Sequence, residues 1–141
     1  MIHIFALFLV AATLLSGCGA GAPYAARTTG CQSGSALVAV GDGFLEILCG
    51  CNEAAGTTVT STALTCTVNS GTTVVFQYVG PKLKHQILST TTGGQTFPHS
   101  PVSDPAVTPG VRSHAFRPSV AGTYSFTDAF NSGLTGQIVA L

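Results

Sequence analysis

The sequence predicts an all-β domain, built as a Greek-key β-sandwich or barrel. Short runs rich in Val, Ile, Thr, Phe and Tyr recur along the chain, and Gly, Pro, Asn or Asp separate them. The 141 residues include 17 Gly and 7 Pro, a composition that favours turns. No segment of the domain shows a sustained helical period, so we expect the strands to pack against one another.

Five of the nine expected strands lie in the first part of this domain, at residues 36–40, 44–49, 57–60, 63–68 and 72–79. A Gly-Asp-Gly turn separates the first two and an Asn-Ser-Gly turn separates the last two. The runs at 44–49 and 63–68 place Glu or Thr between apolar residues, the period-2 pattern of a half-buried strand.

The remaining four expected strands cover residues 85–89, 111–116, 122–128 and 136–141. They are rich in β-branched and aromatic residues. Between the first and second of them, residues 98–110 contain four Pro and predict a long loop. Long loops at one end of a sandwich commonly carry function.

The N-terminal segment is predicted to be a targeting signal and not part of the folded domain. Residues 2–15 form one apolar run of about 14 residues, shorter than the about 20 of a membrane-spanning helix and typical of a signal peptide. The sequence Leu-Ser-Gly-Cys18 then resembles a bacterial lipobox, which implies a diacylated Cys18 as the first mature residue. An ordinary cleaved signal is the alternative, because no Lys or Arg precedes the apolar run.

These signals divide the chain into three parts. Residues 1–17 are the expected lipoprotein signal peptide, residues 18–35 a lipid-anchored flexible tether, and residues 36–141 the folded domain. The expected location is the bacterial cell envelope, on its periplasmic or outer face. Lipid on Cys18 would anchor the domain to the membrane without spanning it.

Charged residues are scarce and balanced. Asp, Glu, Lys and Arg make up 7% of the chain, against about 25% in ordinary soluble domains. Five acids and five bases leave no net charge. Phosphate binding needs clustered Lys and Arg, so nucleic acid is excluded as a partner. The composition identifies no protein partner.

Four cysteines besides Cys18 predict two disulfides in a small exported domain. A bridge between Cys49 and Cys51 is disfavoured because it would close a very small ring. Strand alternation points Cys49 and Cys66 inward, which favours Cys49–Cys66 with Cys31–Cys51 over the swapped pairing. A metal site made of the four thiolates is the less favoured alternative in an oxidising compartment.

Three segments of the C-terminal half form a recognisable series. The first is Val-Asn-Ser-Gly-Thr-Thr-Val-Val-Phe at 68–76, and the second is Lys-His85-Gln-Ile. The third combines Pro-Gly at 109–110, His-Ala-Phe at 114–116 and Gly-Thr-Tyr-Ser-Phe at 122–126. In this order and spacing they resemble the cupredoxins, the blue-copper family of plastocyanin and azurin. The resemblance implies a cupredoxin-like fold, with His85 at the position of the first copper ligand.

The remaining copper ligands of that family are replaced in this chain. The family's pattern C-x-x-H-x-x-M-x-G falls on residues 128–136. Asp128 then stands at the Cys position, Asn131 at the second His position and Leu134 at the Met position, so His85 alone is retained. A blue-copper centre requires two His and a Cys thiolate. The resemblance therefore implies the fold without a complete type 1 copper site.

Two interpretations of His85 and Asp128 follow. In the first, they form a buried polar pair that satisfies itself by hydrogen bonding. In the second, they bind Cu(II) or Zn(II) at a non-blue site, with His99 as a further ligand. The first interpretation is preferred, so no cofactor is expected and copper is the alternative.

The favoured function is that of an envelope-anchored, cupredoxin-like lipoprotein serving as a structural, binding or accessory module. The alternatives are a non-blue copper or zinc protein and, less favoured, a copper electron-transfer protein. An enzyme is not expected, because nucleophile motifs, paired carboxylates and nucleotide-binding loops are lacking.

Overall fold

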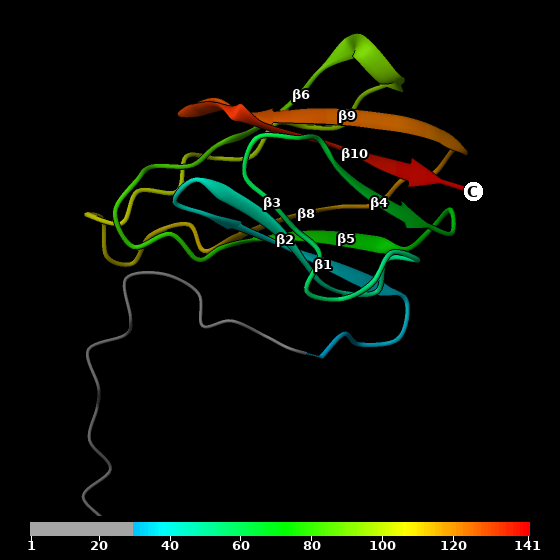
Figure 1. The fold of residues 1–141 in the computed structure, drawn as a ribbon, viewed down its shortest axis with the longest axis horizontal. Coiled ribbons are helices and arrows are strands. Elements are labelled where there is room, and N and C mark those ends of the chain that lie inside the picture. Colours follow the sequence, from blue (N-terminus) through cyan, green and yellow to red (C-terminus); the bar gives the residue numbers. More distant parts are fainter. Residues whose placement is uncertain (1–29) are drawn as a thin grey trace, which may run out of the picture.

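Two β-sheets packed face to face make up the fold in the computed structural model, which describes residues 30–141 (Figure 1). The expected signal peptide, Cys18 and most of the expected tether lie outside the described residues. Within residues 30–141, no helix is long and apolar enough to cross a membrane.

The first sheet has the strand order β3-β2-β1-β5-β8 and the second the order β4-β10-β9-β6, with β7 also paired to β9. The strands of the first sheet are β1 (Ser35–Gly41), β2 (Phe44–Cys49), β3 (Thr58–Val59), β5 (Thr73–Tyr78) and β8 (Ser113–Phe116). Those of the second are β4 (Leu64–Val68), β6 (Ile87–Ser89), β7 (Gly94–Gln95), β9 (Gly122–Asp128) and β10 (Asn131–Ala140). The pairs β1–β5 and β4–β10 are parallel and the others, apart from β7–β9, are antiparallel.

All nine expected strands are present, and the all-β sandwich is confirmed. The structure adds β7 and a short 3₁₀ helix, Thr91–Gly93, which are too short to produce a periodic pattern. Strand β10 begins at Asn131, before the expected residue 136, and its register with β9 shifts between Asn131 and Thr135. That irregularity interrupts the alternation from which a strand is recognised.

The core lies between the sheets and is organised around Phe76 on β5. Its fully buried ring meets Phe126 edge-on at a centroid distance of 4.8 Å, and Phe97 and Phe116 stack on each other at 4.1 Å beside it. These rings come from both sheets and from the loop after β7. Such aromatic pairs add to the burial of apolar area and hold the two layers together.

Two disulfides are present among residues 30–141, as expected, but the favoured pairing of the cysteines is wrong. The bridges are Cys31–Cys49 and Cys51–Cys66. The four sulfurs are therefore bonded in two pairs, and none of them is a free thiolate. The alternative prediction of a metal site made of these thiolates is also wrong.

A β-bulge explains why strand alternation failed to predict the pairing. In β1 and β2, Leu37 pairs with Cys49 and Val38 pairs with Ile47, so Leu48 is an extra residue. Beyond the bulge, the side chains of β2 point to the face opposite to the one that the period-2 alternation predicts. Cys49 joins Leu37 and Leu48 in a small cluster apart from the main core, which Cys31 also contacts.

Candidate functional site

The loops at one end of the sandwich bring together the residues that the sequence singles out. The turn between β1 and β2, the loops at 79–86 and 98–112 and the hairpin between β9 and β10 gather at the left end of Figure 1. His85 lies just before β6, and Asp128 is the last residue of β9. Strands β6 and β9 are paired there, so residues 43 positions apart in sequence become neighbours.

His85 and Asp128 form a direct hydrogen bond in the interior. The distance from His85 Nδ1 to Asp128 Oδ2 is 2.6 Å, and the two residues are 1% and 0% exposed. Because a carboxylate accepts, the Nδ1 atom of the imidazole donates. A contact this short between two buried groups makes a strong, charge-assisted hydrogen bond.

The protein satisfies both oxygens of the Asp128 carboxylate. Oδ2 accepts from His85, while Oδ1 accepts from the backbone N–H groups of Gln86 and Phe130, each at 3.1 Å. Buried polar groups need such partners to offset their loss of water. Asp128 therefore ties the start of β6 to the β9–β10 turn.

Backbone hydrogen bonds fix the main chain of His85, and Tyr78 contacts its imidazole ring. The backbone N–H of His85 donates to Ser103 O at 3.0 Å, and the backbone N–H of Ser103 donates to His85 O at 2.8 Å. Tyr78 of β5 stacks on the ring at a centroid distance of 6.1 Å and an angle of 6°. Burial raises the pKa of Tyr78 to about 12, so its phenol forms a neutral wall of the site at physiological pH.

Asp42 is a member of the site that the sequence analysis missed. Its Oδ1 lies 3.4 Å from His85 Nε2, without the geometry of a hydrogen bond. The same carboxylate accepts from the backbone N–H groups of Lys82 and Leu83, both at 3.0 Å. In the sequence Asp42 belongs to a Gly-Asp-Gly turn, and no local signal reports a partner some forty residues away.

Gly80 lets these groups approach each other. A side chain at this position would bring Cβ to 2.5 Å from His85 Nε2 and into collision with Asp42 Oδ1. The absence of a side chain thus allows the imidazole to sit between the carboxylates of Asp42 and Asp128.

The other candidate residues do not join His85 and Asp128. Leu134 is 1% exposed and packs in the hydrophobic core, and Asn131 pairs with Asp128 through the backbone of the β9–β10 hairpin. His99 is exposed on the Pro-rich loop. His114 contacts the same loop, with its Nε2 atom 3.0 Å from Pro98 O. Among residues 30–141, no three His, Cys, Asp or Glu side chains come together as a metal site would require.

Solved structures provide the comparison for this fold. The purple cupredoxin from Nitrosopumilus maritimus matches with a TM-score of 0.52 at 16% identity, over 75% of this chain and 99% of that chain. The dithionite-reduced auracyanin from the photosynthetic bacterium Roseiflexus castenholzii gives a TM-score of 0.48 at 15% identity, over 77% of this chain and 98% of that chain.

No protein-family model and no curated protein matches the sequence. The two sheets and the similarity to the purple cupredoxin show that this chain has a cupredoxin-like fold, as the sequence resemblance implies.

Proposed function

We propose that this chain is a lipid-anchored, cupredoxin-like protein of the bacterial envelope that works as a binding or accessory module, not as an electron carrier. In this proposal the positions of the copper ligands serve the structure of the domain. The observation that carries it is the Asp128 carboxylate, whose two oxygens accept three hydrogen bonds from His85, Gln86 and Phe130.

The side chains at the ligand positions do not fit a type 1 copper centre. Such a centre needs a thiolate and two imidazoles. This chain has a carboxylate at position 128, an amide at position 131 and an alkyl group at position 134, and its four described cysteines are in disulfides. Leu134 lies in the apolar core, which supports a packing role.

A further feature supports a module anchored at the envelope. The lipobox-like sequence ending at Cys18 supports anchoring, and strand β1 begins at Ser35, which leaves a stretch of chain for a tether.

A second candidate function is a non-blue metal site at His85. The observation that favours it is the buried Nε2 atom of His85, which has no hydrogen-bond partner and faces Asp42 Oδ1 at 3.4 Å. A Cu(II) or Zn(II) ion with nitrogen and oxygen ligands would use such an atom. An ion on Nε2 would leave the hydrogen bond between Nδ1 and Asp128 in place, and it would need a further ligand such as His99 beside Asp42.

Thermal unfolding distinguishes the two candidates. A metal that binds the folded state alone raises the melting temperature according to its concentration and affinity. We expect the full-length protein, purified in detergent, to unfold at the same temperature with a chelator, with Cu(II) and with Zn(II). A rise that His85→Ala or Asp42→Asn abolishes, while His114→Ala retains it, would contradict the proposal and establish the metal site.

A further inference from the structure

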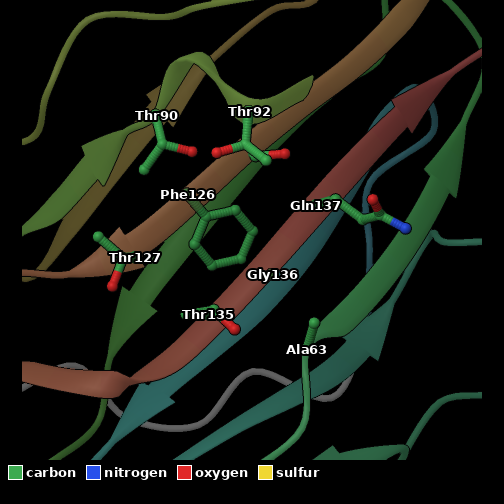
Figure 2. Close-up of a pocket in the computed structure, with 9 residues that line it drawn as sticks. Ala63, Thr90, Thr92, Phe126, Thr127, Thr135, Gly136 and Gln137 are labelled. Atoms are coloured by element: carbon green, nitrogen blue, oxygen red, sulfur yellow. The ribbon is translucent and has the colours of Figure 1, made fainter. Parts of the chain in front are cut away.

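A second feature of the molecule is an uncharged cavity on the outer face of the second sheet, with a volume of about 340 Å³ (Figure 2). Its base is formed by β9 and β10, which are paired so that Thr135 lies opposite Thr127 and Gln137 opposite Ser125. Thr90 and Thr92, from the segment around the 3₁₀ helix, stand on the other side of the cavity. A volume of this size is at the lower end of the range for small-molecule sites, about 300–1,000 Å³.

Five of the residues that line this cavity carry a hydroxyl group, and most of these hydroxyls are available to a ligand. Within the described part of the chain, the hydroxyls of Thr90, Thr92, Ser125 and Thr135 make no side-chain hydrogen bond. Gln137 donates from Nε2 to Thr65 Oγ1 at 3.0 Å, which orients its amide and leaves the oxygen free to accept. Each free hydroxyl both donates and accepts.

The lining contains no charged side chain. A phosphate, sulfate or carboxylate ligand would need Arg, Lys or several convergent N–H groups. The methyl groups of the Thr side chains and of Ala63 supply apolar contacts between the hydroxyls. Alternating hydroxyl and C–H surface is the complement of an uncharged sugar ring.

Gly136 allows close packing beneath the base of the cavity. It faces the core, where the ring of Phe126 occupies the space that a side chain would need, and Leu64 O would lie 3.0 Å from a Cβ atom. Strand β10 therefore packs closely over Phe126 and lies directly beside β4, with which it pairs. Thr135 and Gln137, on either side of Gly136, are held on the outer face, which reduces the ordering that a ligand must impose.

We propose that this cavity binds an uncharged, polyhydroxylated ligand, namely a neutral mono- or oligosaccharide. It lies on the face of β9 opposite to Asp128, since Thr127 and Ser125 point outward while Asp128 and Phe126 are buried. Binding in this cavity is therefore independent of any metal at His85, and the saccharide would be the ligand of the binding module proposed above.

The test is an NMR titration of the ¹⁵N-labelled full-length protein in a zwitterionic detergent without sugar groups. The probes are maltose, cellobiose and N,N′-diacetylchitobiose, with glucuronic acid as a charged comparison. We expect at least one neutral disaccharide to shift the amide signals of Thr90, Ser125, Thr135 and Gln137, and glucuronic acid to bind more weakly. Absence of shifts with all three disaccharides, or equal binding of glucuronic acid, would overturn the proposal.

Substitutions that remove single hydroxyls test the site itself. Thr135→Val and Ser125→Ala each remove one hydrogen-bonding group and should raise Kd about 3- to 10-fold. Thr60→Val makes the same chemical change at an exposed position that does not line the cavity, and should leave Kd unchanged. Unchanged binding by both cavity variants, folded as judged by their NMR spectra, would place the ligand elsewhere and contradict the proposal.

Discussion

Asp128→Ala should lower the free energy of unfolding by about 3–5 kcal/mol, because it removes the buried carboxylate that accepts hydrogen bonds from three donors. The donors are His85 Nδ1 and the backbone N–H groups of Gln86 and Phe130. At 0% exposure the space left by the carboxylate is closed to bulk water, so these groups lose one partner without gaining another. Urea unfolding of the full-length protein measures the difference.

Two further variants separate the loss of hydrogen bonds from a general sensitivity to substitution. Asp128→Asn retains an oxygen that can accept from Gln86 and Phe130, and should destabilise less than Asp128→Ala. Asp104→Ala removes a solvent-facing carboxylate that pairs with Lys84 at 2.8 Å, and should have a much smaller effect because solvent screens that pair. If Asp128→Ala were as stable as the wild type, the structural role of the pair would be wrong.

The second large effect is the gain of a blue-copper centre. The combined substitution Asp128→Cys, Asn131→His and Leu134→Met should produce an intense thiolate-to-copper absorption band in the visible spectrum with Cu(II). It restores the thiolate, the second imidazole and the thioether that the site requires. His85 already presents Nδ1 toward position 128, and position 131 pairs with 128 across the β9–β10 hairpin.

A matched variant isolates the thiolate. Asn131→His with Leu134→Met keeps Asp128, so it should bind copper without the intense band. A folded triple variant that stays colourless would contradict the correspondence between residues 128–136 and the ligand loop of the blue-copper family.

Regular alternation made most of the fold predictable. Leu64, Cys66 and Val68 are buried while Thr65 and Thr67 are more exposed, as their alternation indicates. Strand β9 alternates in the same way, which places Asp128 on the inner face. The correspondence with the blue-copper pattern then put His85 and Asp128 at one place, although neither residue carries a local signal for the other.

Other features could not be predicted because they depend on tertiary geometry. A single extra residue, Leu48, reverses the direction of Cys49 and changes the disulfide pairing. Asp42 reaches His85 because the loop at 80–83 folds over the β1–β2 turn and Gly80 leaves room. The cavity on the outer face of the second sheet forms only because the segment around Thr91–Gly93 lies beside β9. That contact follows from the pairing of β7 with β9.

The fold alone does not determine function, since one fold hosts many activities. We propose that the ligand positions of this cupredoxin-like domain hold a structural His–Asp pair in place of blue copper. The most direct measurement is the visible spectrum of the wild-type, full-length protein with Cu(II), recorded beside the triple variant. We expect an intense band in the triple variant and none in the wild type. An intense thiolate-to-copper band in the wild type would show that the His85–Asp128 pair does not take the place of blue copper.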